Sequence, residues 1–243
     1  VRVGLVLLIL GGLLFLLTPF AAGCFPSQAL VAAFGDSVTW GYGGRPGGWV
    51  TELEERTDEP IANLGVPGET AAEAEDRVNG PLGLPLAPQA EIVLLLHGGN
   101  DMNQAFHRSP CNLTCDPHDL PEVDAKYVRI GDHLRAIAKK ADKGRKVVFA
   151  TYWPPNPIAC PDYDAEEFAG FQAAIGRLNE EILAVAAEKG HFVVRLDDIP
   201  DYDLDPHHYY DCLHPSGEGY ETLATRWLAD KDEWLPENGF RDE

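Results

Sequence analysis

Apolar residues along the chain gather in five short runs, and segments with a helical spacing of apolar positions separate most of these runs. Glu91–His97 is the clearest run, because Ile, Val and Leu follow one another as in a strand whose two faces are both covered. Ala165–Lys189 is the clearest helix, since its apolar residues recur every three or four positions. The predicted strands are Ala29–Phe34, Ile61–Leu64, Glu91–His97, Lys146–Tyr152 and Phe192–Leu196.

Helices are predicted between and after these strands, and a long polar loop is predicted from Met102 to Pro121. Strands that alternate with helices indicate an α/β protein with a parallel sheet covered on both faces. Ligands of such sheets bind at the carboxyl ends of the strands. The predicted helices are Trp49–Arg56, Glu69–Val78, Val123–Lys143, Ala165–Lys189 and Ser216–Leu228.

The first residues form an almost unbroken apolar stretch, from Val3 to Phe20, which is typical of an export signal. Ala21-Ala22-Gly23-Cys24 follows and resembles a bacterial lipobox, in which the cysteine is lipidated and becomes the new N-terminus. We therefore expect residues 1–23 to be a signal peptide and residues 24–243 to be a single domain. An uncleaved membrane anchor and ordinary secretory cleavage are the alternatives. All three place the domain outside the cytoplasm.

The chain has five cysteines, and lipidation of Cys24 would leave four. We expect disulfides Cys111–Cys115 and Cys160–Cys212, although four cysteines allow three pairings. Cys111, Cys115 and His118 could instead be three metal ligands. Export favours disulfides, so no metal is predicted.

Composition narrows the class of protein further. The 243 residues are 45% hydrophobic, which is enough for one core, and we expect a monomer. The formal net charge is −20, from 39 acidic and 19 basic residues. This charge argues against nucleic acid or an anionic membrane surface as the main partner, because phosphate binding needs a basic surface.

A serine, a histidine and a carboxylate stand in two distant segments. Phe34-Gly35-Asp36-Ser37 closes the first strand, and Asp211-Cys212-Leu213-His214 lies near the end of the chain. In a catalytic triad, His214 would take the Ser37 proton, and Asp211 would orient the imidazole from one helical turn away. Alternatively, Ser37 is a turn or helix-cap residue and Asp211 caps the following helix. We expect the Asp36 carboxylate to bond to the loop backbone.

Two further segments lie between these ends. Ile61-Ala62-Asn63-Leu64-Gly65 runs into a glycine turn, and Ile92–Leu96 leads to His97-Gly98-Gly99-Asn100. Ser, Gly, Asn and His in this order, at strand ends or in the last loop, resemble the SGNH (GDSL-type) hydrolase family from about Ala29 to Trp227.

This resemblance implies a three-layer α/β/α, flavodoxin-like fold with a central five-stranded parallel sheet. It implies Ser37, Asp211 and His214 as the catalytic residues, with no cofactor. The backbone N–H groups of Ser37 and Gly65 and the Asn100 amide would stabilise the oxyanion.

The predicted function is an extracytoplasmic serine esterase that cleaves short-chain acyl or acetyl esters through an acyl-enzyme. Its partners would be a small-molecule ester or an acylated carbohydrate, and the membrane through the lipid anchor. The alternatives are an O-acyltransferase acting on a carbohydrate and a non-catalytic surface binding lipoprotein.

Several aromatic and histidine side chains remain outside this scheme. We expect His97 to be a hydrogen-bonded core residue and His207 and His208 to lie at the surface. The aromatic residues of the expected rim loops could stack on an aryl ester or a sugar, or could pack as satellite clusters. They are Trp40, Tyr42, Trp49, Tyr152, Trp153, Tyr209 and Tyr210.

Overall fold

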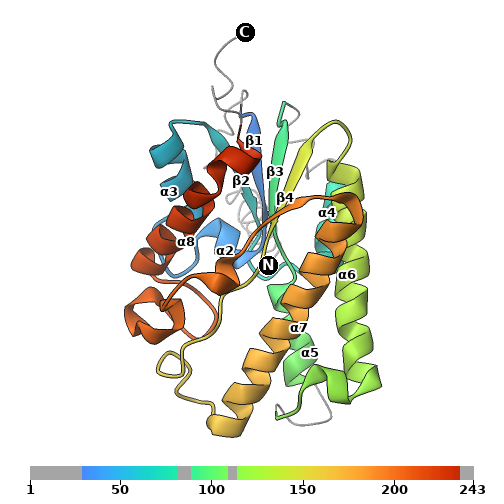
Figure 1. Cartoon of the computed structure of the whole chain (residues 1–243), viewed down its shortest axis with the longest axis vertical. Helices are drawn as coiled ribbons and strands as arrows, with labels where there is room; N and C mark the ends of the chain where they lie inside the picture. Colours follow the sequence, from blue (N-terminus) through green and yellow to red (C-terminus); the bar gives the residue numbers. More distant parts are fainter. Residues whose placement is uncertain (1–28, 81–88, 109–113, 236–243) are drawn as a thin grey trace, which may run out of the picture.

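A computed structural model describes residues 29–80, 89–108 and 114–235 of the chain (Figure 1). Five parallel strands form one sheet in the order β2-β1-β3-β4-β5. The strands are β1 (Val31–Gly35), β2 (Ile61–Gly65), β3 (Ile92–Leu96), β4 (Lys146–Ala150) and β5 (Phe192–Val194). The helices are α2 (Ser37–Trp40), α3 (Gly48–Thr57), α4 (Ala71–Asn79), α5 (Gly99–His107), α6 (Pro121–Ala141), α7 (Ala165–Lys189), α8 (Gly217–Ala229) and α9 (Lys231–Trp234).

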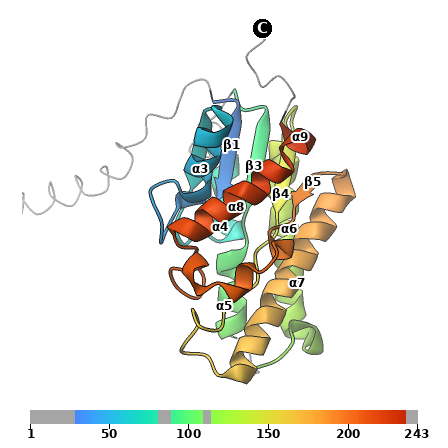
Figure 2. The same ribbon diagram turned by 60° about the vertical axis from the view of Figure 1, so that its left-hand side comes forward.

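Helices cover both faces of the sheet. Figure 1 shows α3 and α8 on one side of the strands and α4, α6 and α7 on the other. Figure 2, which brings the first side forward, shows α3 and α8 running side by side. The predicted three-layer α/β/α fold with a five-stranded parallel sheet is therefore confirmed.

The register of the first three strands brings their carboxyl ends together. Gly35 at the end of β1 pairs with Gly65 on one side and with Leu96 on the other. Every residue of β1 and β3 is buried, as expected for strands covered on both faces. The segments that follow β1, β2 and β3 therefore start from one level at the edge of the sheet, which is where the predicted site residues lie.

Helix α7 spans the predicted residues because its local signals are strong. Asp164 and Glu167 form a capping box at its start, and Gly190 ends it in the left-handed conformation at φ 67°. Both signals are encoded by neighbouring residues, so they can be recognised without any tertiary information.

Helix α5 was missed, since Met102 to Pro121 was predicted to be a loop. The helix starts after Gly98, which has φ 110°, and it buries Met102, Ala105 and Phe106. These apolar residues have the i, i+3, i+4 spacing of a helix. This short pattern was hard to recognise in the sequence, because two glycines and four polar residues lie before and between the apolar positions.

Three sequence predictions concern the N-terminal region and one cysteine pair. The signal peptide 1–23, Cys24 and Cys111 lie outside the described residues. Within the described ranges, no helix combines the length and the apolar composition needed to cross a membrane.

Candidate active site

The turn after β1 presents Ser37 at the start of the short helix α2. Asp36 caps this helix: its Oδ1 accepts a hydrogen bond from the Val38 N–H at 3.0 Å, as expected. A side chain at Gly35 would place Cβ 2.1 Å from Thr39 Oγ1, so only glycine fits before this turn. The capped turn therefore holds Ser37 at the edge of the sheet, where 8% of the residue is exposed.

Ser37, His214 and Asp211 form one hydrogen-bonded chain. Ser37 Oγ lies 3.0 Å from His214 Nε2, and His214 Nδ1 lies 2.9 Å from both carboxylate oxygens of Asp211. Because a carboxylate only accepts hydrogen bonds, Nδ1 carries the proton and Nε2 of the neutral ring accepts from the Ser37 hydroxyl. The structure thus brings together the three residues singled out as a triad.

A bend, rather than the expected helical turn, brings Asp211 to His214. Asp211 Oδ1 accepts from the backbone N–H groups of Leu213 and His214, both at 2.8 Å. Burial alone would raise the pKa of Asp211, but the hydrogen bonds from His214 and these backbone groups outweigh it, and the pKa lies below its usual value. Asp211 is therefore ionised at neutral pH and can stabilise an imidazolium.

The loop that carries Asp211 and His214 is tied to the loop after β4. Cys160 and Cys212 form a disulfide, as predicted. The Tyr209 hydroxyl donates to the Pro154 carbonyl at 2.5 Å. These ties compensate for the absence of sheet hydrogen bonds in this part of the site, where Tyr209 and Pro215 form only an isolated bridge.

The prediction that Gly65 offers its N–H to a substrate needs correction. Gly65 is the last residue of β2, and its N–H donates to Asn63 Oδ1 at 3.0 Å. Gly68, three residues later, has φ 79°, and no atom lies within 4 Å of a Cβ placed there. The Gly68 N–H makes no hydrogen bond to any described residue. The structure therefore moves the candidate backbone donor from Gly65 to Gly68.

Asn100 lies beside this turn, in the first turn of α5. Its Nδ2 donates to the Glu69 carbonyl at 3.0 Å. An amide nitrogen has two hydrogens, so one of them remains for another acceptor. The bond to Glu69 holds the Asn100 side chain against the Gly68 turn.

A buried ionic cluster supports the same turn. The Glu69 carboxylate receives hydrogen bonds from Arg77 at 2.5 and 2.6 Å and from His97 Nε2 at 3.0 Å. Burial would raise the pKa of Glu69, but these bonds outweigh it and lower the pKa. His97 is 1% exposed, which confirms its prediction as a hydrogen-bonded core residue.

Known proteins share this fold, and one family shares the sequence pattern of most of the chain. The sequence profile of the GDSL-like lipase/acylhydrolase family matches residues 33–222. The chain belongs to this family. It is therefore an ester-cleaving hydrolase, and the predicted resemblance is confirmed. No match was found among curated protein sequences.

Three solved structures illustrate the fold that the chain shares with known proteins. A lipolytic protein of the G-D-S-L family from Veillonella parvula has 19% identity and a TM-score of 0.61, covering 82% of this chain and 96% of its own. An acetyl xylan esterase, AlAXEase, has 19% identity and a TM-score of 0.60, covering 82% and 98%. The lipase/acylhydrolase from Enterococcus faecalis has 20% identity and a TM-score of 0.58, covering 84% and 95%. At these identities the similarity concerns the fold.

A small cavity of the acylhydrolase opens between Ser37, Asn100 and His214. Its volume is about 40 Å³, which suits a small group. Its remaining wall is mainly apolar and comes from α5, α7 and the loops after β4 and β5. The apolar lining residues include Met102, Trp153, Pro155, Phe171, Ile175 and Leu213.

The aromatic residues expected at the rim of the acylhydrolase site divide into two groups. Trp40, Tyr42 and Tyr210 are 51%, 48% and 60% exposed. The Tyr42 ring lies 4.6 Å from the His214 ring and 5.8 Å from the Tyr210 ring, measured between centroids. The other four are buried and pack into the protein: Trp49, Tyr152, Trp153 and Tyr209.

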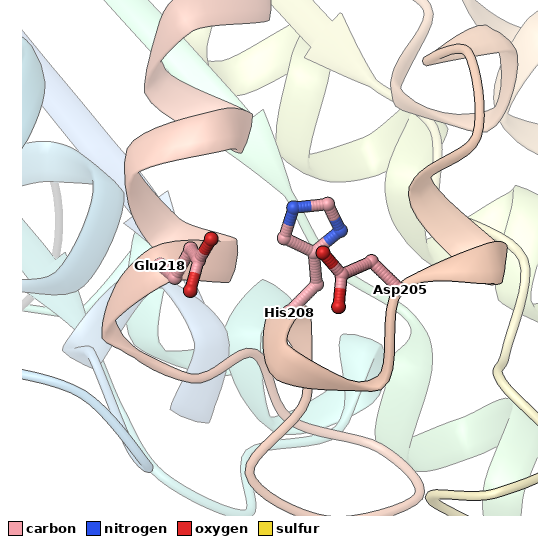
Figure 3. A group of neighbouring side chains, drawn as sticks. All are labelled: Asp205, His208 and Glu218. Carbon is pink, nitrogen blue, oxygen red and sulfur yellow. The ribbon is translucent and has the colours of Figure 1, made fainter.

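One group of side chains in the described part of the chain could hold a metal ion. The ligand atoms of Asp205, His208 and Glu218 all lie within 4.8 Å of one another. Figure 3 shows the His208 imidazole between the two carboxylates, with Glu218 on α8. His208 Nδ1 lies 3.1 Å from the Tyr202 carbonyl, so Nε2, which lies 3.4 Å from Thr222 Oγ1, is the candidate ligand atom. None of the three belongs to the hydrogen-bonded chain of Ser37.

The alternative metal site at Cys111, Cys115 and His118 includes a residue outside the described ranges. The predicted disulfide Cys111–Cys115 also includes Cys111, which lies outside the described ranges. His118 itself lies 2.9 Å from a carboxylate oxygen of Glu180 and 3.7 Å from one of Asp124.

Two supporting residues were missed by sequence reasoning. Asn63 holds the α2 turn through a 2.7 Å bond from its Nδ2 to the Thr39 carbonyl. Its signal was a polar residue inside an otherwise apolar strand. Asn179 bonds to the backbone of Tyr152 from the middle of α7, and no local pattern marks it.

Proposed function

We propose that this acylhydrolase is a serine esterase in which Ser37 is the nucleophile, His214 the general base and Asp211 the residue that orients His214. The observation that carries the proposal is the 3.0 Å contact between Ser37 Oγ and His214 Nε2, continued to Asp211. Ser37 Oγ attacks the ester carbonyl carbon while His214 takes its proton. His214 returns the proton to the leaving alcohol, and water then hydrolyses the acyl-enzyme by the same steps.

Three donors are proposed to stabilise the oxyanion: the backbone N–H groups of Ser37 and Gly68 and the free hydrogen of the Asn100 amide. The charge that develops on the carbonyl oxygen requires donors that are already in place. The unpaired N–H of Gly68 and the Asn100–Glu69 bond support this assignment.

We assign the cavity beside Ser37 to the acyl group and propose a preference for acetyl and other short chains. The support is the size of the cavity, about 40 Å³, and the presence of Phe171 and Ile175 in its wall. A long acyl chain would have to displace these side chains from α7.

The exposed rings of Tyr42 and Tyr210 are assigned to the alcohol side, because His214 must deliver its proton to the leaving alcohol. Flat rings beside the general base favour a cyclic alcohol such as a sugar. The fold is shared with a protein named acetyl xylan esterase, which makes an acetylated sugar a suitable first substrate. The same surface would receive the acceptor hydroxyl if the enzyme transfers acyl groups.

The domain 24–243 is proposed to work outside the cytoplasm as a monomer, held by a lipid on Cys24 after removal of residues 1–23. The Cys160–Cys212 disulfide supports an oxidising compartment. Cys24→Ser should release the protein from the membrane fraction of the producing cell. Sedimentation of both forms would favour an uncleaved anchor, and release of both would favour secretory cleavage.

The test of the chemistry is hydrolysis of p-nitrophenyl esters from acetate to palmitate by a soluble chain that starts after Cys24. Activity should be highest for acetate or butyrate and should disappear in Ser37→Ala. An optimum at long chains would contradict the acyl assignment, and an active Ser37→Ala would contradict the serine mechanism. A folded protein that is inactive on every ester but acylates an added oligosaccharide would identify a transferase.

The alcohol side is tested with Tyr210→Ala, which leaves the Tyr42–His214 contact in place. Its KM for an acetylated xylan oligosaccharide should rise severalfold, on the order of the loss of one aromatic contact. Its KM for ethyl acetate should not change. Equal changes for both substrates would contradict the assignment.

A further inference from the structure

Tyr152 is buried behind the site rather than exposed on its rim. It follows β4, and only 6% of it is exposed. Asn179 on α7 holds its backbone with two hydrogen bonds, from the Tyr152 N–H to Oδ1 at 2.7 Å and from Nδ2 to the Tyr152 carbonyl at 2.8 Å. The ring is therefore fixed by the packed layer of the sheet and α7.

The hydroxyl of Tyr152 bridges two segments of the site that are far apart in the sequence. It donates to Asp36 Oδ2 at 2.8 Å and accepts from the Gly99 N–H at 3.0 Å. Asp36 uses its other oxygen to cap the helix that begins with Ser37. Gly99 is the residue before Asn100. One hydroxyl thus connects the nucleophile turn with the start of α5.

The charge of the Asp36 carboxylate determines which way the Tyr152 hydroxyl bonds point. Burial, and then the Asp36 carboxylate, raise the pKa of Tyr152 well above its usual value, so the hydroxyl keeps its proton. A neutral hydroxyl donates once and accepts here from Gly99. The contact is also tight, since a Cβ at Gly99 would lie 2.9 Å from the Tyr152 ring.

We propose that Tyr152 is a positioning residue that sets the distance between the Ser37 N–H and the Asn100 amide. This inference rests on the proposed function, in which both groups bind the oxyanion. Such donors are effective only when they are in place before the reaction, and small displacements are costly. Without the hydroxyl, Asp36 Oδ2 and the Gly99 N–H would be left unpaired in the interior, and the two segments could move apart.

The experiment compares Tyr152→Phe with the wild type and with Tyr127→Phe. Tyr127 is a matched control, because it is fully buried on α6 and its hydroxyl has no partner among the described residues. We expect Tyr152→Phe to lower kcat on p-nitrophenyl acetate about 10- to 30-fold, with KM within about threefold of the wild type. Tyr127→Phe should retain the wild-type kcat. Rates are expressed per active site, titrated with a serine-directed phosphonate.

A double-mutant cycle with Asn100→Ala separates positioning from a general loss of structure. If Tyr152 acts through the oxyanion donors, Tyr152→Phe should lower kcat less than about threefold once Asn100 is removed. The inference would be overturned if Tyr152→Phe lowered kcat by the same factor with and without Asn100. It would also be overturned if the loss of kcat were no larger than in Tyr127→Phe, or if only KM changed.

Asp36→Asn provides a second variant if Tyr152→Phe does not fold. The hydroxyl would then face an uncharged amide, and kcat should fall severalfold with the same coupling to Asn100. Unchanged kcat in a folded Asp36→Asn would overturn the inference. Loss of activity in Ser37→Ala together with normal kcat in Tyr152→Phe would leave the esterase mechanism intact and reject only the positioning role.

Discussion

The two halves of the proposed catalytic centre are held in different ways. Ser37, Gly68 and Asn100 follow the ends of three neighbouring strands, whose register is set by sheet hydrogen bonds. Asp211 and His214 lie in a loop of bends and 3-10 turns, with 17% of the His214 side chain and 44% of the Asp211 side chain exposed. A disulfide and side-chain bonds to the loop after β4 hold this second half.

The two halves are therefore positioned by different kinds of contact. Parallel strands that end at one level already bring together the residues that follow them. Side-chain bonds from Asn63, Asn100 and Tyr152 then fix the turns that carry the proposed nucleophile and oxyanion donors. The acid–base pair comes from a late loop that receives no such register. Its position depends on a small number of specific links, and these links are where the comparison can be tested.

The largest effect is expected at the loop half. His214→Ala should lower kcat about 10⁴-fold or more, because Ser37 loses the base that takes its proton. Hydrolysis of p-nitrophenyl acetate measures this change. His207→Ala is the matched control in the same loop, since that side chain is exposed and should not affect the rate. Comparable losses of kcat in both variants would mean that a disturbed loop, rather than the missing His214 imidazole, lowers the rate.

The disulfide is the next test. Replacing Cys160 and Cys212 together by Ala should lower the free energy of unfolding by about 4 kcal/mol, from the 52-residue separation that the bond closes. The activity of the folded variant should also fall, because Cys212 is adjacent to Asp211. Urea unfolding and active-site titration measure the two effects. A variant with unchanged stability and rate would show that the loop holds its shape without the covalent link.

Asn100→Ala tests the sheet half. The loss of one oxyanion donor should lower kcat about a hundredfold, or about 3 kcal/mol, with little change in stability. Asn79→Ala serves as the control, because Asn79 is an exposed amide at the end of α4. A rate for Asn100→Ala close to that of the wild type would remove Asn100 from the oxyanion site.

The smallest effect concerns acid stability of the turn that carries Gly68. The pKa of Glu69 is lowered in the folded protein, so its contribution is complete above the ordinary pKa of a glutamate and is lost as the pH falls through the folded-state value. Glu69→Gln should therefore have a lower Tm than the wild type at pH 7. Its Tm should then fall less than that of the wild type between pH 7 and pH 3.5, by roughly 2 °C or more. Glu122→Gln, at an exposed position of α6, is the control. An unchanged pH dependence of Tm in Glu69→Gln would contradict the ionic role of this carboxylate.

Helices and strands of this protein were predictable where the signal is local. The boundaries of α7 follow from the capping box at Asp164 and from Gly190, and β3 follows from its apolar run. Helix α5 was missed, because Met102, Ala105 and Phe106 are few and follow glycines that usually mark turns.

The site was predictable in its residue types and less so in its geometry. Ser37 and His214 are 177 residues apart, and only the order of the motifs connected them in the sequence. Gly65 and Gly68 could not be distinguished in this way, because the difference lies in a strand hydrogen bond to Asn63 and in a backbone angle.

The sequence by itself determined the alternation of strands and helices, the residue types available for ester cleavage and the order of the site segments. These are properties of neighbouring residues, and they appear as spacing and composition. Only the tertiary structure decided that Cys160 pairs with Cys212, that Gly68 rather than Gly65 has a free N–H, and that Tyr152 is buried while Tyr42 is exposed. Each of these depends on which distant segments lie in contact, because hydrogen-bond direction and burial are set by the register of the sheet and the packing of its helices.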